Sequence, residues 1–152
     1  MKISQLLNKE SIISNLESVD KKGIIEELSK SIASSTKASS KDIASVLLER
    51  EQLGSTGIGG GIAIPHGKLH SINSITIGFG LSHKGVEYDS LDNKPVHIFF
   101  LLLTPENSTG GHLKVLAQIS KLLKMDHFKE NLRQAQSVDQ IYEIIKEVDE
   151  DF

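Results

Sequence analysis

Several kinds of chemistry are excluded by what this sequence lacks. Its 152 residues include no cysteine, so disulfide bonds, thiolate catalysis and cysteine–zinc sites are ruled out. The longest strongly apolar run, residues 96–103, is far shorter than the roughly 20 residues of a membrane-spanning helix. The first residues hold no apolar run of signal-peptide length. We therefore expect a cytoplasmic protein that is not embedded in a membrane.

Excess charge of one sign is also missing. The 17 basic and 20 acidic residues give a formal net charge of −3, whereas nucleic-acid-binding domains usually present a basic face. We expect no nucleic-acid partner. A hydrophobic content of 38% and a charged content of 24% are typical of a globular chain. The length suits one domain over residues 1–152 with a core of useful size.

Glycine is concentrated in one place. Six of the twelve glycines lie within residues 54–68, where a Gly/Ser/Thr-rich loop precedes a short apolar run at residues 62–64. That run reads as a buried strand, and Pro65 marks its end because proline donates no ladder hydrogen bond. His66 is then expected to leave the strand into a loop and to present its imidazole to a ligand or partner.

The residues around His66 suit phosphoryl chemistry. A neutral imidazole can act as a nucleophile, a base or a metal ligand, and clustered backbone N–H groups of a Gly/Ser/Thr loop can hold an anion. The alternative is that a histidine after proline is an ordinary surface residue. A nucleotide-binding P-loop is not formed, because five residues separate Gly61 from Gly67 where that motif has four. The dinucleotide-binding glycine pattern is also incomplete.

The remaining pattern predicts a layered α/β fold. Apolar spacing and capping residues predict the order β-α-α-β-β-β-α-α-α, which favours a single-domain α/β sandwich with a mixed central β-sheet flanked by helices. The expected strands are residues 12–16, 62–64, 75–81 and 96–103. The expected helices are 20–33 capped by Asp20, 40–50 capped by Ser39 or Ser40, one with His112 in its first turn, 126–135, and one capped by Ser137.

Two further side chains are candidates for the site. Arg50 ends a helix that feeds the glycine loop, and its planar fork of donors matches phosphate oxygens; it can equally be a helix-end cation beside the C-terminal dipole. His112 lies at a helix N-terminus, where backbone N–H groups attract anions, and can equally be an ordinary polar residue at a helix start.

The motifs resemble one family over nearly the whole chain. The segment Gly-Ser-Thr-Gly-Ile-Gly-Gly-Gly-Ile-Ala-Ile-Pro-His-Gly-Lys of residues 54–68 is similar to the active-site segment of fructose/mannitol-type enzyme IIA domains of the phosphoenolpyruvate-dependent phosphotransferase system. It resembles most the stand-alone, nitrogen-regulatory branch. Further matches in family order are residues 48–51, 88–95, 100–105 and 112–113. One departure is Gly60, which stands where that branch usually has Asn, and it should loosen the loop.

The resemblance implies a phosphocarrier. His66 would take a phosphoryl group on Nε2 from an HPr-like protein, with Arg50 and His112 beside it and with no metal or nucleotide cofactor. We expect a phosphoryl-cradling loop made of Gly54, Ser55, Thr56, Gly57, Gly59 and Gly67.

The resemblance also implies regulatory targets in potassium uptake and nitrogen metabolism, such as transport or sensor-kinase components. Because the chain carries no IIB or IIC domain, the regulatory branch is preferred to the main alternative, a sugar-uptake IIA that passes phosphate to a IIB domain. A hydrolase that uses His66 as a base, with Ser55 or Thr56 as nucleophile, is a third hypothesis, although no motif joins these residues as a triad.

Overall fold

The apolar run near residue 100 forms β6 (Val96–Pro105), which lies in the middle of the sheet. This computed structural model describes residues 2–107 and 109–149. Its side chains alternate between two cores: residues 98, 100 and 102 enter one cluster, and residues 99, 101 and 103 enter the other. Successive side chains of a strand point to opposite faces. A strand covered on both faces is therefore apolar at nearly every position.

Five other strands complete the sheet, which is mixed as predicted but has six strands where four were expected. The sheet order is β1-β5-β6-β3-β2, and β4 pairs with β6 outside this path. Strand β5 runs antiparallel to β6, whereas β3 and β4 run parallel to it; β1 is parallel to β5, and β2 is antiparallel to β3. Their bounds are β1 (Leu7–Ile13), β2 (Gly57–Gly59), β3 (Ile62–Ala63), β4 (His66–Leu69) and β5 (Thr76–Val86).

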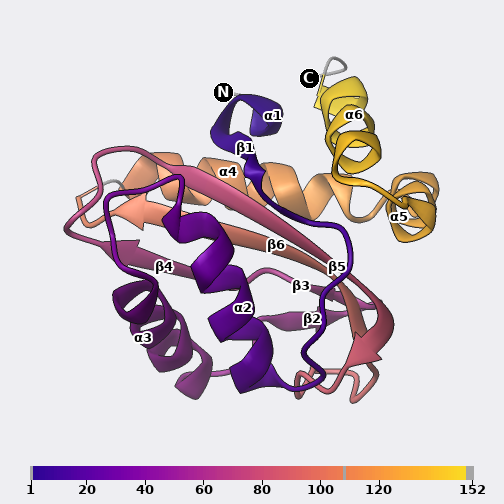
Figure 1. The fold of residues 1–152 in the computed structure, drawn as a ribbon, viewed down its shortest axis with the longest axis horizontal. Coiled ribbons are helices and arrows are strands. Elements are labelled where there is room, and N and C mark those ends of the chain that lie inside the picture. Colours follow the sequence, from indigo (N-terminus) through magenta and orange to yellow (C-terminus); the bar gives the residue numbers. More distant parts are fainter. Residues whose placement is uncertain (1, 108, 150–152) are drawn as a thin grey trace.

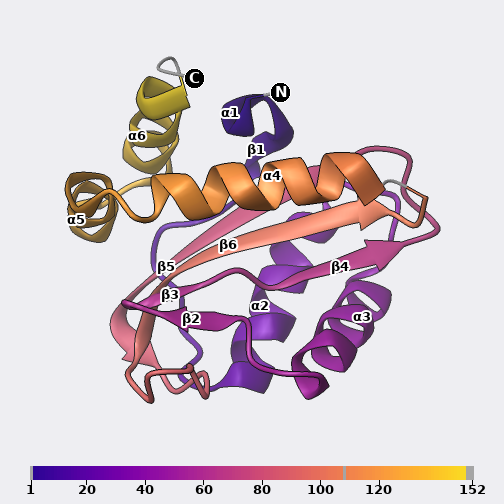
Figure 2. The ribbon, with the colours of Figure 1, turned by 180° about the vertical axis from the view of Figure 1, so that it is seen from behind.

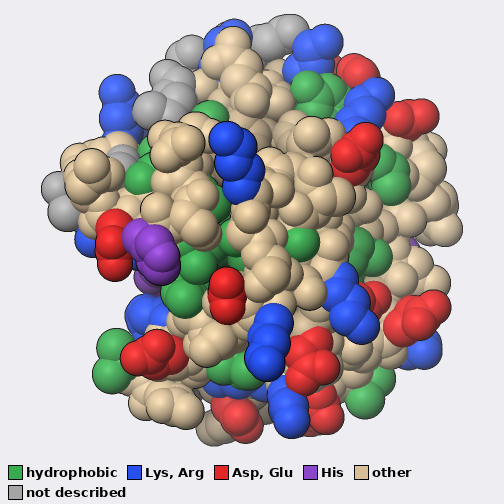
Figure 3. Space-filling view, turned by 60° about the vertical axis from the view of Figure 1, so that its left-hand side comes forward, with side chains coloured by type: hydrophobic (Ala, Val, Ile, Leu, Met, Phe, Trp, Pro, Cys, Tyr) green, Lys and Arg blue, Asp and Glu red, His purple; other side chains and the backbone are tan. Residues whose placement is uncertain are grey.

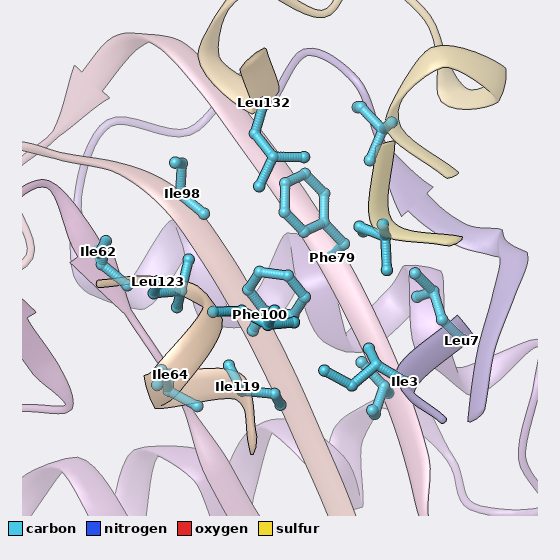
Figure 4. Close-up of a cluster of buried hydrophobic side chains, with 14 of the residues drawn as sticks. Ile3, Leu7, Ile62, Ile64, Phe79, Ile98, Phe100, Ile119, Leu123 and Leu132 are labelled. Atoms are coloured by element: carbon cyan, nitrogen blue, oxygen red, sulfur yellow. The ribbon is translucent and has the colours of Figure 1, made fainter. Parts of the chain in front are cut away.

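Helices cover both faces of this sheet. Helices α2 (Lys21–Ala33) and α3 (Ser40–Gln52) lie on one face, and α4 (Thr109–Leu122), α5 (Asp126–Gln134) and α6 (Val138–Asp149) lie on the other with the short α1 (Ile3–Leu6) (Figures 1 and 2). In the second layer, the Phe79 and Phe100 rings meet edge to face, 5.0 Å apart between centroids (Figure 4). This is the α/β sandwich expected from the sequence.

The predicted helix starts are confirmed by their caps. Asp20 accepts a hydrogen bond from the Gly23 N–H at 2.8 Å, and Ser39 accepts one from the Asp42 N–H at 3.1 Å. The Ser137 hydroxyl accepts from the N–H of Gln140 at 3.2 Å. Each bond satisfies a donor that a helix would otherwise leave unpaired at its first turn. The helix expected to hold His112 in its first turn begins at Thr109, and His112 lies in that turn.

The prediction for the N-terminal region differs from the structure in two ways. The first strand covers residues 7–13 instead of 12–16, and α1 precedes it. Strand β1 has polar residues at positions 8–10 and a register shift between Leu7 and Ile12, so it shows no simple alternation. A four-residue helix such as α1 leaves too few residues to show a helical period.

The prediction that His66 enters a loop is wrong. His66 is the first residue of β4 and pairs with Leu102 of β6. Pro65 interrupts the pairing without ending it, because its carbonyl accepts a hydrogen bond from the Leu102 N–H at 3.0 Å. Strands β3 and β4 thus lie end to end along one edge of β6. The glycine-rich loop also contributes β2, which was not predicted.

Charge on the surface is mixed. On the face shown in Figure 3, acidic and basic side chains are interspersed and neither sign gathers into one continuous patch. Among residues 2–107 and 109–149, no helix combines the length and apolar composition needed to cross a membrane.

Candidate phosphoryl-transfer site

His66 is held through one ring nitrogen, and the other has no hydrogen-bond partner among residues 2–107 and 109–149. Its Nδ1 lies 2.8 Å from the Ile64 carbonyl oxygen, and the side chain is half-buried at the start of β4. A carbonyl oxygen can only accept, so the neutral imidazole carries its proton on Nδ1. The lone pair is then on Nε2. This tautomer makes Nε2 the nucleophilic atom.

The surroundings favour the neutral form of this ring. Burial lowers the pKa of His66 below its usual value of 6.5, and the Arg50 guanidinium lowers it further. The Ile64 carbonyl and the Glu51 carboxylate act in the opposite direction without reversing the shift. Because burial penalises the charged imidazolium, the ring remains a neutral nucleophile at pH 7.

His112 brings a second imidazole to the same place. Its ring centroid lies 5.4 Å from that of His66, with the planes inclined at 55°. Its Nδ1 lies 3.3 Å from the hydroxyl of the buried Thr104 in β6. Burial lowers the pKa of His112, and the neighbouring His66 and Lys68 lower it further. The family resemblance implied that His66 and His112 lie together, and the structure brings them together although they are 46 positions apart in the chain.

Arg50 reaches this pair from the other helical layer. It lies in the last turn of α3, and one guanidinium nitrogen donates to the Gly54 carbonyl at 2.9 Å. An open cavity of about 390 Å³ contains the site, and its lining includes Arg50, Lys68, His66, His112 and the acidic Glu49. Strand β4 lies between α4 on one side and α3 on the other, and it packs against α3 (Figure 2). Two cations, two imidazoles and the Glu49 carboxylate therefore share one pocket.

Lys68 is a site residue that the sequence reading did not assign. It is exposed, lines the cavity and is paired with Thr104 of β6. Residues two apart in a strand share a face, so Lys68 lies on the same side of β4 as His66. If residues 66–69 had been recognised as a strand, the position of Lys68 beside His66 would have been predicted.

Close packing explains Gly67. A Cβ built on Gly67 would lie 2.5 Å from the Val46 Cγ1 of α3, well inside van der Waals contact. The absence of a side chain lets α3 approach β4 closely. Gly67 thus has a packing role, which brings the end of α3, and Arg50 with it, towards His66.

The rest of the predicted cradle is engaged elsewhere. The N–H of Gly54 bonds the Glu51 carbonyl, the N–H of Thr56 bonds the Glu51 carboxylate, and that of Gly57 bonds the Ser55 hydroxyl. These three N–H groups therefore have partners inside the protein. The expectation that they hold a phosphoryl group receives no support from this arrangement.

The tip of the glycine loop also lies apart from His66. Gly59 pairs with Ile62, which is opposite Ile98 of β6, whereas His66 is opposite Leu102. Four strand residues span about 13 Å. The glycines of β2 therefore form a hairpin directed away from the histidine pair.

Gly60, the departure from the family motif, lies in this hairpin. Its φ is +67°, and its N–H donates to the Asp92 carboxylate at 3.1 Å. Hydrogen bonds from the N–H groups of Lys94 and Gly60 lower the pKa of Asp92. The turn is therefore tied to the neighbouring 88–94 loop despite having no side chain at position 60.

The remaining histidines are not at the site. His97 Nδ1 lies 2.8 Å from the Ser82 carbonyl oxygen, and His70 is exposed beyond the end of β4. Among residues 2–107 and 109–149, no three His, Asp or Glu side chains converge in a group that would hold a metal ion. His66 and His112 alone provide two ligands, fewer than the three or four protein ligands of zinc sites.

Comparison with known proteins gives one consistent result. A model of the family described as "Phosphoenolpyruvate-dependent sugar phosphotransferase system, EIIA 2" matches residues 5–148. A "Nitrogen regulatory protein" of Bradyrhizobium diazoefficiens is 37% identical over 145 residues, which is 95% of each chain. The "PTS system fructose-specific EIIABC component" of Bacillus subtilis is 39% identical over 150 residues, 98% of this chain but only 24% of that protein.

Solved structures agree with these sequence matches. The crystal structure of nitrogen regulatory protein IIA-Ntr from Neisseria meningitidis is similar with a TM-score of 0.88 and 34% identity, covering 94% of this chain and 98% of that one. The IIA mannitol structure from Escherichia coli, at 20% identity and a TM-score of 0.76, shares the fold over 91% of this chain and 97% of that one.

Proposed function

The chain belongs to the EIIA type 2 family of the phosphoenolpyruvate-dependent sugar phosphotransferase system, as its motifs predicted, and from this premise we propose that it is a phosphotransferase that carries a phosphoryl group on Nε2 of His66. The observation that carries the proposal is the 2.8 Å contact between Nδ1 of His66 and the Ile64 carbonyl. It leaves Nε2 as the free nitrogen of a neutral ring, beside a cation and a second imidazole.

The donor in this proposal is the phosphohistidine of a small HPr-like protein. The Nε2 lone pair of His66 attacks phosphorus, and the electron pair of the breaking P–N bond returns to the donor imidazole. Such transfer depends on positioning and on neutralising the charge of the phosphoryl oxygens. Arg50 and Lys68 provide the positive charge at the pocket, and His112 is near enough to hydrogen-bond an oxygen.

The proposed role is regulatory. Phosphorylation adds about −1.5 to −2 charges, by analogy with other phosphorylated side chains, to a pocket that is open to a partner. The two states can then bind different proteins, with potassium-transport and nitrogen-metabolism components, sensor kinases among them, as the proposed targets in the cytoplasm. The nitrogen regulatory protein of Bradyrhizobium diazoefficiens, 37% identical and aligned along 95% of each chain, supports this role.

Relay to a sugar-specific IIB domain is the second candidate. The fructose-specific relative supports it, since at 39% it is as similar in sequence as the nitrogen regulatory one. Adding a IIB domain to the phosphorylated protein separates the two roles. Rapid loss of the phosphoryl group to IIB would favour the relay; retention, with capture of transport or kinase components by one state only, would favour the switch.

The hydrolase hypothesis has little support in the geometry. The Ser55 hydroxyl accepts from the Gly57 N–H and lies 3.4 Å from the Tyr88 carbonyl. The Thr56 hydroxyl bonds the Glu51 carboxylate. Both candidate nucleophiles are therefore held by groups other than His66.

Intact mass after incubation with a phosphorylated HPr-like donor tests the proposed carrier. We expect one acid-labile phosphoryl group on the wild-type protein and none on His66→Ala. His70→Ala, an exposed histidine four residues further along, is the matched control and should accept the group normally. Uptake by His66→Ala, or no uptake by the wild-type protein from donors of either branch, would refute the proposal.

A further inference from the structure

Glu51 is a buried carboxylate that the proposed transfer does not use. It directly follows Arg50 in α3 and is 7% exposed. One carboxylate oxygen lies 3.0 Å from the ammonium nitrogen of Lys21 and accepts the Thr56 N–H at 3.1 Å; the other accepts the Thr56 hydroxyl. A buried carboxylate is costly unless it is paired and hydrogen-bonded. Glu51 has both kinds of partner.

The network continues into the core. With its hydrogen directed to Glu51, the Thr56 hydroxyl accepts from the Tyr88 hydroxyl at 3.1 Å. Tyr88 is fully buried, and burial raises its pKa, so the phenol keeps its proton. The Lys21 ammonium lies 4.8 Å from the centre of the Tyr88 ring. The ammonium of Lys21, at the start of α2, thus compensates the negative charge of the Glu51 carboxylate.

Arg50 and Glu51 hold the same short segment from two sides. The Arg50 guanidinium donates to the Gly54 carbonyl at 2.9 Å, and the Glu51 carboxylate holds both the N–H and the hydroxyl of Thr56. The Gly54 N–H also bonds the Glu51 main-chain carbonyl at 3.1 Å. Consecutive helix residues point about 100° apart, so one side chain reaches the pocket while the next reaches the interior.

We infer that Glu51 is a positioning residue for phosphoryl transfer: by fixing residues 54–56 through Thr56, it places the Gly54 carbonyl that holds the Arg50 guanidinium beside His66. This inference rests on the proposed function. Glu51 does not act on the phosphoryl group itself, since its carboxylate is buried and bonded to Thr56 and Lys21. Its effect passes through Arg50.

Steady-state phosphorylation of Glu51→Gln tests this role. The amide keeps the shape of the side chain but cannot hold the Thr56 hydroxyl and the Lys21 ammonium as a carboxylate does. We expect the maximal rate to fall roughly 10- to 100-fold, the range for misplacing a catalytic group by up to about 1 Å. The half-saturating donor concentration should not change, because Glu51 does not reach the docking surface.

Glu27→Gln is the matched control. Glu27 is a half-buried carboxylate of α2 that likewise accepts loop N–H groups, from Glu17 at 3.0 Å and from Ser18 at 3.0 Å. The same substitution there should leave the rate unchanged. A folded Glu51→Gln protein with the wild-type rate, or an equal loss in Glu27→Gln, would overturn the inference.

Two further comparisons test the route through Arg50. In an Arg50→Lys background, Glu51→Gln should have little additional effect, because groups that act through one another are not additive; a full additional loss would overturn the inference. Thr56→Val, which leaves the Lys21–Glu51 pair intact, should also slow transfer, and Thr56→Ser should restore most of the rate. These variants keep the test decisive if Glu51→Gln does not fold.

A donor-free measurement separates this inference from the proposed function. Arg50 lowers the pKa of His66, so freeing Arg50 by Thr56→Val should raise the midpoint of the His66 titration followed by NMR. Thr56→Ser should move it less. If the wild-type protein accepts no phosphoryl group, the proposed function fails while this shift still supports the positioning role. An unchanged midpoint in Thr56→Val would overturn that role whatever the transfer assay shows.

Discussion

Substituting Gly67 by alanine should displace α3 and damage the site without touching a catalytic group. The added Cβ would lie 2.5 Å from the Val46 Cγ1, whereas carbon atoms in contact prefer about 3.5–4.0 Å. About 1 Å of movement is therefore required. Val46 is β-branched and has one strongly preferred χ1 rotamer in a helix, so α3 itself has to move. Overpacking of this kind costs about 1–3 kcal/mol.

The displacement has two measurable consequences. For a chain of this length, 1 kcal/mol lowers the melting temperature by about 2–4 °C, so Gly67→Ala should melt roughly 2–12 °C below wild type. Arg50 is carried on the same helix, and a shift of about 1 Å can reduce a rate by as much as 10²-fold. Phosphoryl acceptance from the HPr-like donor should fall more than the loss of stability alone would explain, because the protein remains folded at the assay temperature.

A compensating change identifies the clash as the cause. In Val46→Ala/Gly67→Ala the offending methyl group is removed, and both stability and transfer rate should recover relative to Gly67→Ala. The control for stability is Gly110→Ala in α4, where an added Cβ meets no atom within 4 Å and a better helix former replaces glycine. The reasoning is refuted if Gly67→Ala melts and transfers like wild type, or if the double variant shows no recovery.

Three other outcomes follow from single features of the structure. Because burial lowers the pKa of His66, transfer should hold as the pH falls through 6.5. Stability should decline over the same range, since the unfolded chain gains a proton that the folded chain resists; His66→Gln should weaken that decline in thermal melts. The fully buried Asp149 carboxylate accepts the N–H groups of Ile3 and Ser4, so Asp149→Ala should destabilise the protein by roughly 1–3 kcal/mol in urea unfolding. At Gly60, with φ at +67°, Gly60→Asn should lower the melting temperature less than Gly60→Ala, because Asn tolerates left-handed backbone better.

The elements predicted correctly from the sequence are those whose signals are local. Helix α2 is marked by Asp20 at its cap and by apolar residues at helical spacing, and α6 by Ser137. Strand β6 is recognisable because both of its faces are buried. Its sequence is therefore a continuous apolar run and does not alternate between apolar and polar residues. In each case the information lies within a dozen residues.

The elements missed from the sequence depend on partners far along the chain. Strand β4 exists because four residues after Pro65 pair with residues 102–105 of β6, and nothing within residues 66–69 indicates that pairing. Strand β2 lies among glycines, which carry no hydrophobic signal. The same limit applies to the expected anion cradle: glycine spacing shows that N–H groups are available, but not that Glu51 and the Ser55 hydroxyl already bond them.

The convergence of the three site residues was predicted by motif, and its physical basis is the two-layered core around β6. Arg50 arrives with α3 from the layer containing Leu47 and Leu101, whereas His112 arrives with α4 from the layer containing Ile119 and Phe100. Strand β4 is an edge strand that lies between the two layers, so a side chain on it can contact both Arg50 and His112. The proposed acceptor, His66, is therefore placed on the sheet, and the two side chains proposed to assist it come from opposite faces. Neither core layer can shift without changing the distance from His66 to one of them.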